Sequence, residues 1–235
     1  MPTVLITGSN RGLGFEFARQ YASEGWRVVA TCRNVEHAKE LRALSDRVTV
    51  HKLEVTSNSE ISALAKEMRG MTVDLLINNA AAQGPSGKTA TFGNLDVESW
   101  LEVFRTNAIA PLKITEALIE NVRCSQRKMI VFISSSAGSI SERGQLPHHK
   151  PGGSYIYRTS KAALNAAAKS LAFDLKTEGI SVLVLHPGWV RTDSGGTSAD
   201  LEVAFSVKCM REVIASFSLP QSGAFKDYTG KDIGW

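Results

Sequence analysis

Short apolar runs rich in β-branched residues alternate with longer helical patterns along the whole chain, and this alternation constrains the fold more than any other feature. It is typical of βαβ units, in which a helix connects each strand to the next strand of a parallel sheet. The runs are continuously apolar, as expected for strands covered by helices on both faces. The expected strands are Thr3–Thr7, Arg27–Thr31, Val48–His51, Val73–Asn78, Lys128–Ser134 and Ile180–His186.

The helices between these strands have recognisable ends. A capping box of Ser57 and Glu60 precedes apolar residues at helical spacing, and Gly70 follows them. The segments Trp100–Asn121 and Tyr157–Glu178 have the pattern of long helices. Gly179 follows the second of these segments and suits a helix C-cap. The same segment is rich in alanine, which fits close packing and high helix propensity equally well.

These elements predict an α/β fold with one doubly wound, Rossmann-like parallel sheet and helices on both faces. We expect a single domain over residues 1–235, with polar, glycine-rich loops at about 139–154 and 193–205. Loops at the carboxyl ends of such a sheet are where ligands bind.

Composition excludes several classes of protein. A net charge of +4 over 235 residues is too small to indicate a nucleic-acid partner. A membrane helix needs about 18 consecutive apolar residues, and no run in the sequence approaches that length. The scattered cysteines Cys32, Cys124 and Cys209, with no leader sequence before the first strand, predict a reduced, cytoplasmic protein. The pair His148 and His149 is expected to lie in a solvated loop, so no metal site is predicted.

The segment from Thr7 to Gly14 follows the first expected strand and opens a helix. Its glycines permit positive φ and leave room for a pyrophosphate, while the N–H groups and dipole at the helix start favour negative charge. The spacing is Gly-x3-Gly-x-Gly, so the position in the first βα turn carries the prediction of a dinucleotide site. The expected contacts are Gly8, Ser9, Asn10, Arg11, Gly12, Leu13 and Gly14.

In dinucleotide-binding folds, a carboxylate at the end of the second strand, about 20 residues after the glycine loop, binds the ribose 2′-OH. The second expected strand of this sequence ends without a carboxylate at that place. Arg33 follows that strand instead, and Arg11 lies within the glycine loop. A guanidinium binds a 2′-phosphate through charge-assisted hydrogen bonds. NADP(H) is therefore favoured over NAD(H); the alternative is that Arg33 is a solvated loop residue.

Tyr157 and Lys161 stand four residues apart, on one face of an expected helix. A fixed positive charge beside a phenol favours the phenolate, so Lys161 is expected to lower the pKa of Tyr157 and make it useful for acid–base catalysis. The alternative is a simple pair on a helix surface. Tyr155 is a less suitable phenol because Thr159, and not a lysine, follows it at the same spacing.

The sequence resembles the short-chain dehydrogenase/reductase superfamily, because its motifs occur in the family's order over essentially the whole chain. The motifs are Thr7-Gly8-x3-Gly12-x-Gly14, Asn78-Asn79-Ala80-Ala81, Ser135-Ser136-Ala137-Gly138, Tyr157-x3-Lys161 and His186-Pro187-Gly188. The segments from Tyr157 to Ala166 and from His186 to Thr192 are more narrowly similar to sniffer-type carbonyl reductases and C-factor proteins.

The resemblance implies a catalytic tetrad of Asn107, Ser135, Tyr157 and Lys161. Tyr157 would give a proton to the carbonyl oxygen while Ser135 donates a second hydrogen bond to it. Lys161 would hold the nicotinamide ribose, and Asn107 would link it to solvent through its main chain and a water. Ser135 is chosen over Ser134 because only Ser135 fits the family's Ser-x-x-Gly pattern.

The resemblance also implies further cofactor contacts. The implied residues, besides the tetrad's Tyr157 and Lys161, are Leu53, Glu54, Val55, Asn79, Ala80, Ala81, Pro187, Gly188, Val190 and Thr192. Two of these positions depart from the family pattern, since Ala81 replaces a glycine and Glu54 replaces an aspartate that meets the adenine.

The function that follows is NADPH-dependent reduction of an aldehyde or ketone, with Tyr157 as the proton donor. The alternatives are an NAD(P)-dependent alcohol dehydrogenase and a cofactor-sensing signalling protein without significant turnover. Substrate contacts are expected from Ser135, Gln83, Tyr155 and Trp189, beside the Gly195–Gly196 loop. A homodimer or homotetramer is expected, as is usual in such families.

Overall fold

The computed structural model describes residues 1–85, 91–145 and 153–235, and a seven-stranded sheet forms its core. The strand order is β3-β2-β1-β4-β5-β6-β7, and all neighbouring pairs are parallel. The strands are β1 Thr3–Ile6, β2 Arg27–Cys32, β3 Val48–Lys52, β4 Leu75–Asn78, β5 Met129–Ile133, β6 Ser181–His186 and β7 Ala224–Asp227. The first six lie where the sequence predicts them, and β7 adds an edge strand that the sequence did not reveal.

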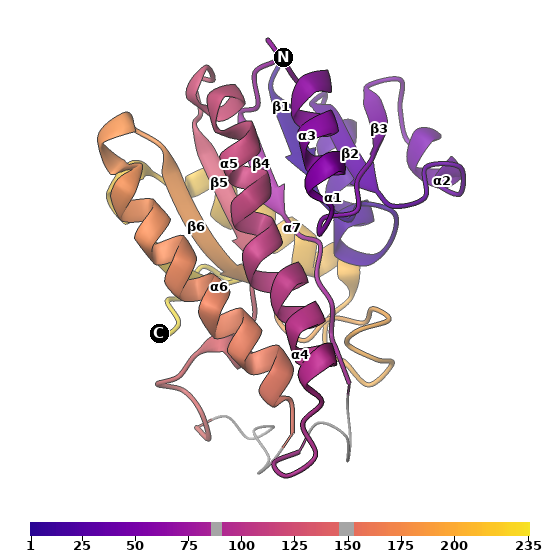
Figure 1. The fold of residues 1–235 in the computed structure, drawn as a ribbon. Helices are drawn as coiled ribbons and strands as arrows, with labels where there is room; N and C mark the ends of the chain where they lie inside the picture. The colour runs from indigo at the N-terminus through magenta and orange to yellow at the C-terminus, as the bar shows by residue number, and fades with distance from the viewer. Residues whose placement is uncertain (86–90, 146–152) are drawn as a thin grey trace.

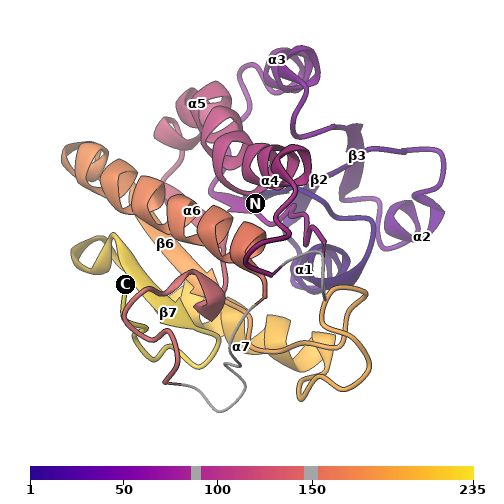
Figure 2. The same cartoon turned by 60° about the horizontal axis from the view of Figure 1, so that its bottom comes forward.

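Helices cover both faces of this sheet (Figure 2). The helices are α1 Gly12–Ser23, α2 Lys39–Arg42, α3 Asn58–Glu67, α4 Val97–Phe104, α5 Ala110–Arg123, α6 Tyr155–Asp174 and α7 Val203–Ser216. Apolar residues of α1, α2 and α7 form one core against the sheet, and those of α3, α5 and α6 form the other. Every residue of β1, β4 and β5 is buried, which explains why their sequences are continuously apolar.

The expected capping box is present only in part. The Ser57 side chain accepts a hydrogen bond from the Glu60 N–H and begins α3, as predicted. The Glu60 carboxylate, however, accepts the N–H of Glu54 and pairs with Lys52 at 2.9 Å. Because β3 ends beside α3, these partners outcompete the N–H of Ser57.

The expected helix from Trp100 to Asn121 consists of three elements. Asp96 accepts the Ser99 N–H and begins α4, a π-helical turn over Arg105–Ile109 interrupts the α-helical pattern, and α5 continues to Arg123. The second long helix begins at Tyr155, and after a short 3-10 turn it ends at Gly179, which adopts φ +74° as predicted for a C-cap.

The order of successive strands reverses between β1 and β4, and this switch point is where doubly wound folds bind ligands. Loops that follow these strands gather at one end of the molecule, at the bottom of Figure 1. The polar loop expected at 139–154 lies partly outside the described residues, together with His148 and His149. In the described ranges, no helix is long and apolar enough to cross a bilayer.

Candidate active site

The end of β5 and the first turns of α6 bring Ser135, Tyr157 and Lys161 together. A hydrogen bond joins the Ser135 hydroxyl to the Tyr157 phenol. The Lys161 Nζ lies 5.8 Å from the centroid of the Tyr157 ring and donates a hydrogen bond to the Ile133 carbonyl at 2.9 Å. The turn after β5 therefore supplies the serine, and α6 supplies both the phenol and the lysine, whose ammonium contacts the last residue of β5.

The pKa of Tyr157 differs from the sequence prediction. Burial raises the pKa of this phenol above its ordinary value, and the hydrogen bond with Ser135 opposes the change without reversing it. The predicted lowering of the Tyr157 pKa is wrong, because burial is the largest cause of the shift and raises the pKa. The Lys161 ammonium donates its hydrogen bond to the Ile133 carbonyl.

Lys161 is itself deeply buried, with 2% of its surface exposed. Burial lowers the pKa of its ammonium to about 8, since no carboxylate compensates for the lost hydration. Lysines whose pKa is shifted by burial are typical of functional sites, and this one lies over the ring of the Tyr157 phenol.

The three consecutive serines after β5 have distinct environments. Ser134 is buried, and its hydroxyl donates to the Asn165 side chain on α6 at 2.5 Å. Ser135 caps the 3-10 turn Ser136–Gly138, accepts the Ala137 N–H at 3.1 Å and faces Tyr157. The geometry thus leaves Ser135 as the serine able to contact a carbonyl beside Tyr157.

Gly138 explains the Ser-x-x-Gly pattern physically. A Cβ at this position would lie 2.8 Å from the carbonyl carbon of Lys161 and 2.9 Å from the Asn165 side-chain nitrogen. The turn that carries Ser135 can therefore approach the backbone of α6 only because residue 138 has no side chain.

We expect Gly138→Ala to push this turn away from α6 and to lower kcat by about tenfold, because small misplacements of catalytic groups are costly. NADPH affinity should remain, since the glycine loop is not touched. Steady-state kinetics and NADPH titration test this, with Ser136→Ala as a control that adds no atom toward α6. A Gly138→Ala enzyme with wild-type kcat would disprove this role for the glycine.

Asn107 is fully buried in the π-helical turn between α4 and α5. Its side-chain oxygen accepts the Ala82 N–H at 2.8 Å, and its nitrogen donates to the Ala82 carbonyl at 2.8 Å and to the Ser160 hydroxyl at 3.0 Å. The side chain therefore fixes the segment after β4 to α6. Because these bonds occupy the side chain, the expected link from Lys161 to solvent would use the main chain of Asn107. The π-helical turn alters the regular i to i−4 hydrogen bonding of that main chain.

The glycine loop packs tightly against the residues after β4. Gly8 has φ +67°, and a Cβ on Gly14 would lie 2.2 Å from the Gly8 carbonyl oxygen. The Asn79 side chain donates to the carbonyls of Thr7 and Gly8 at 2.9 and 3.1 Å, and Ala80 donates its N–H to the Thr7 hydroxyl. The loop thus has one defined shape at the sheet's reversal point.

The start of α1 suits a pyrophosphate. Among the described residues, no side chain caps this helix, so its first N–H groups are available to an anion. Ser9 is buried and donates to the Ile6 carbonyl at 2.8 Å, which holds the turn open above the helix. Asn10 is exposed and Leu13 is half-buried at the same turn. The glycine loop therefore fits the phosphate-bearing part of a dinucleotide.

The segment after β6 lies across this loop. Arg11 forms an ion pair with Asp193 at 2.7 Å, and a Cβ on Gly12 would lie 3.5 Å from the Thr192 methyl. Sequence reasoning missed Asp193 because 182 residues separate it from its partner and no local pattern connects them. Thr192 is thus placed against the glycine loop, where a cofactor's phosphates and nicotinamide would lie close to it.

Arg33 is exposed at the end of β2, and its guanidinium lies 3.9 Å from the Glu54 carboxylate. Glu54 also accepts hydrogen bonds from the N–H and hydroxyl of Thr56. Leu53 and Val55 are buried, so their side chains pack in the core and leave only main-chain atoms for an adenine. Ala81, which replaces the family's glycine, is exposed.

The Pro187–Gly188 turn is held by residues that the sequence did not single out. The Ser206 hydroxyl donates to the Pro187 carbonyl at 2.6 Å. A Cβ on Gly188, which has φ +81°, would lie 3.0 Å from the Tyr228 ring. Val190 is buried behind this turn and accepts the Thr192 N–H at 2.8 Å.

The substrate candidates lie around this end of the sheet without forming one cluster. Tyr155 is 37% exposed and its ring lies 6.4 Å from that of Phe92. Trp189 is 46% exposed and donates its indole N–H to the Gly195 carbonyl. Gln83 is exposed. All three are exposed, so their side chains are accessible to a ligand at this end of the sheet.

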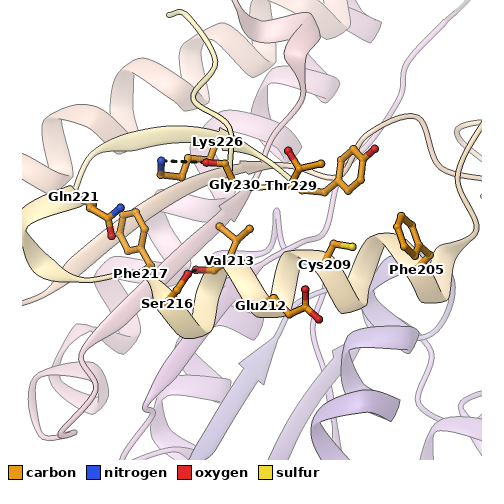
Figure 3. A pocket seen from close by; sticks show the side chains of 11 residues that line it. Phe205, Cys209, Glu212, Val213, Ser216, Phe217, Gln221, Lys226, Thr229 and Gly230 are labelled. Carbon is orange, nitrogen blue, oxygen red and sulfur yellow. Dashed lines mark hydrogen bonds between the residues drawn. The ribbon is translucent and has the colours of Figure 1, made fainter.

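A separate cavity of about 500 Å³ lies between α7 and the chain that follows β7 (Figure 3). Cys209 and Val213 point toward the 226–230 segment, and Phe205 lies at one end. None of the residues that line the cavity belongs to the tetrad, and Tyr228 lies between the cavity and Gly188. The cavity is therefore distinct from the cluster of Ser135, Tyr157 and Lys161.

Comparison with known proteins agrees with this geometry. The family model for short chain dehydrogenases matches residues 2–202. The chain is 39% identical over 163 residues to the C-signal protein of Myxococcus xanthus, covering 69% of this chain and 93% of the relative. The structure of an NADPH-bound carbonyl reductase from chicken fatty liver matches with a TM-score of 0.90 and 34% identity, covering 100% of this chain and 99% of the reductase. The carbonyl reductase Sniffer of Drosophila melanogaster has a TM-score of 0.90 and 31% identity over the whole of both chains.

Proposed function

We propose that this chain, which belongs to the short-chain dehydrogenase/reductase family, uses NADPH to reduce the carbonyl group of an aldehyde or ketone to an alcohol. The chain is an oxidoreductase of the class that acts on CH–OH or carbonyl groups. The observation that carries the finer proposal is the hydrogen bond between Ser135 and Tyr157 beside the buried Lys161.

The bound cofactor supplies a hydride to the carbonyl carbon, and this chain's residues handle the charge that develops on the carbonyl oxygen. Tyr157 donates its proton to that oxygen, and the Ser135 hydroxyl donates a hydrogen bond to it. The raised pKa of Tyr157 keeps the phenol protonated at neutral pH, so a proton is present for transfer, but it also makes the phenol a weaker acid. Lys161 lies on the same face of α6, where it would hold the ribose hydroxyls, and the main chain of Asn107 would connect it to solvent.

The test is a panel of aldehydes and ketones assayed with NADPH, with the alcohol product identified. Net consumption of NADPH matched by alcohol supports reduction. The same residues would catalyse alcohol oxidation with NAD(P)⁺, so the panel includes the corresponding alcohols. Turnover only from alcohols would favour the dehydrogenase alternative.

A second candidate function is a cofactor-sensing signalling protein without significant turnover. The observation that favours it is the similarity to the protein named C-signal. Tight NADPH binding with no turnover across the panel would support this candidate and contradict the reductase. The Ser135–Tyr157–Lys161 arrangement favours the reductase, because binding alone needs no phenol beside a buried lysine.

For the cofactor we propose NADP(H) over NAD(H), with Arg33 and Arg11 as the 2′-phosphate ligands. Arg33→Ala should weaken NADPH binding by about tenfold, the cost of a charge-assisted hydrogen bond at an exposed site, while NADH binding stays unchanged. Dissociation constants for both cofactors measure this, with the exposed Arg69→Ala as control. Equal losses for the two cofactors, or tighter binding of NADH by the wild type, would refute the assignment.

We also propose a cytoplasmic homodimer or homotetramer. Three free cysteines suit a reducing compartment. The large apolar side chains Val97, Leu101 and Phe173 are exposed on α4 and α6, at 61%, 48% and 82%, which suits a contact between subunits. Light scattering of the purified protein gives the assembly size, and a monomer would contradict this part of the proposal.

A further inference from the structure

The last three residues of the sequence, Ile233–Trp235, lie against the segment that follows the Ser135 turn, and we call them the tail segment (Figure 1). The Ser139 hydroxyl donates to the Gly234 carbonyl at 2.6 Å, and the Ser141 N–H donates to the Trp235 carbonyl at 2.8 Å. The Gly234 N–H donates to the Glu142 carboxylate at 3.0 Å. Three hydrogen bonds thus join parts of the chain more than 90 residues apart.

Ser139 connects the tail segment to the catalytic turn. It is 3% exposed, and its hydroxyl accepts the Glu142 N–H at 3.1 Å while donating to the tail segment. Its own N–H donates to the Ser136 carbonyl, and the Gly138 N–H donates to the Ser135 carbonyl. The turn that presents Ser135 is therefore fixed by β5 at one end and by the tail segment at the other.

The contact is close at Gly234. A Cβ at this position would lie 2.3 Å from the Ser141 hydroxyl oxygen and 3.7 Å from the Glu142 side chain. A side chain at residue 234 would displace the Ser141 hydroxyl, so the glycine allows this close contact with residues 139–142.

Trp235 anchors the tail segment to the rest of the fold. Its ring lies 5.6 Å from that of Phe225, a residue of β7 that is 2% exposed. The Lys169 Nζ lies 5.2 Å from the Trp235 ring centroid, in a cation–π contact. Lys169 belongs to α6, so the tail segment is attached to the same helix that carries Tyr157 and Lys161. The Ile233 N–H adds a hydrogen bond to the Phe225 carbonyl at 2.8 Å.

We propose that the tail segment is a positioning element for catalysis: it holds the Ser135 turn at the correct distance from Tyr157 through Ser139, with the Trp235 ring as its anchor. This inference rests on the proposed reductase function. Catalytic groups need placement within a fraction of an ångström. The turn already packs against α6 at Gly138, and the tail segment adds a further contact at Ser139, on the side away from β5. Trp235 and Gly234 act through Ser139 and touch no reacting atom.

Trp235→Ala removes the anchor and keeps the main chain of the tail segment. We expect kcat per NADPH-binding site to fall by about tenfold, as for other small misplacements of a catalytic group, with NADPH affinity unchanged. Trp235→Phe should restore kcat, because it keeps a ring for Lys169 and Phe225. The control Asp232→Asn removes the nearby ion pair with Lys226, which does not touch residues 139–142, and should retain wild-type kcat.

Hydrogen–deuterium exchange of the same variants gives a readout that needs no turnover. In Trp235→Ala, and in Gly234→Ala as a second variant, the amides of Ser139, Ser141 and Glu142 should exchange faster, while those of the glycine loop stay protected. Counting NADPH-binding sites in each variant removes any contribution from unfolded protein.

The outcomes separate the two proposals. A wild-type protein that turns over, with Trp235→Ala at the same kcat per NADPH-binding site, would overturn the positioning role. Unchanged exchange at residues 139–142 would overturn it as well. A wild-type protein without turnover on any carbonyl compound would instead overturn the proposed function, whatever the exchange data show.

Discussion

Replacing Tyr157 with phenylalanine is expected to lower kcat for carbonyl reduction by about a thousandfold, which is within the range that general acid catalysis contributes. The substitution removes the proton donor and the partner of Ser135 but keeps the ring that packs beside Lys161. NADPH binding should change little. Stopped-flow or steady-state measurement of NADPH consumption gives kcat, and fluorescence titration gives the dissociation constant.

Tyr21→Phe is the matched control for this substitution. Tyr21 is a second buried phenol, with a pKa raised by burial to about 12, and it packs between α1 and α7 under the Arg211 guanidinium. Its hydroxyl is remote from Ser135 and should have no part in turnover. Equal kcat values for the wild type and Tyr157→Phe would show that the Tyr157 phenol is not the proton donor.

The second large effect is expected from Lys161→Met, which should lower kcat by about a hundredfold, because losing the group proposed to hold the nicotinamide ribose would misplace the reacting ring. It should also change how stability depends on pH. The pKa of Lys161 is about 8 in the folded protein and 10.5 as the ordinary value, so between these pH values the unfolded chain binds a proton that the folded chain does not. Stability of the wild type therefore rises with pH across this window.

The Met variant carries no such group and should lack this rise. From pH 8 to pH 10.5, the free energy of unfolding of the wild type should rise by about 3 kcal/mol more than that of the variant, at about 1.36 kcal/mol per pKa unit. Urea unfolding of the cofactor-free proteins at several pH values measures it. Lys113→Met, on an exposed face of α5, serves as control and should follow the wild type. Parallel curves for Lys161→Met and the wild type would show that Lys161 is not the buried titrating group.

The sequence allowed the sheet to be predicted where local patterns are strong. Continuous apolar runs identify the buried strands β1, β2, β4, β5 and β6, since a strand covered on both faces has no polar alternation. Strand β3 lies at one sheet edge, and only its first residue is buried. The seventh strand, Ala224–Asp227, is short and lies at the sheet edge, and two of its four residues are charged. Only its pairing with β6 makes it a strand, and pairing between distant segments leaves no local mark.

The site shows the same division. Spacing on one helix face predicted that Tyr157 and Lys161 would lie together, and the Ser-x-x-Gly pattern predicted the serine that faces them. The direction of the Tyr157 pKa shift could not be predicted, because it depends on how much protein surrounds the phenol. The contact of Ser139 with Gly234 was equally hidden, since it joins residues 95 apart along the chain.

The π-helical turn at Asn107 is a similar case. Apolar spacing continues from α4 into α5, so the sequence predicts one regular helix. The turn is stabilised by contacts of the Asn107 side chain with Ala82 and Ser160, which come from separate elements. Tertiary contacts of a buried polar side chain therefore override the local helical pattern at this residue.

Transfer of deuterium tests the central claim most directly. The protein is incubated with a carbonyl compound and NADPH that carries deuterium at one of the two positions of the reactive nicotinamide carbon, and the alcohol is analysed by mass spectrometry. We predict that the alcohol carries the deuterium from one labelled form and not from the other, with the Tyr157→Phe variant forming it far more slowly. An alcohol without deuterium from either form, or no alcohol at all, would contradict hydride transfer at this site.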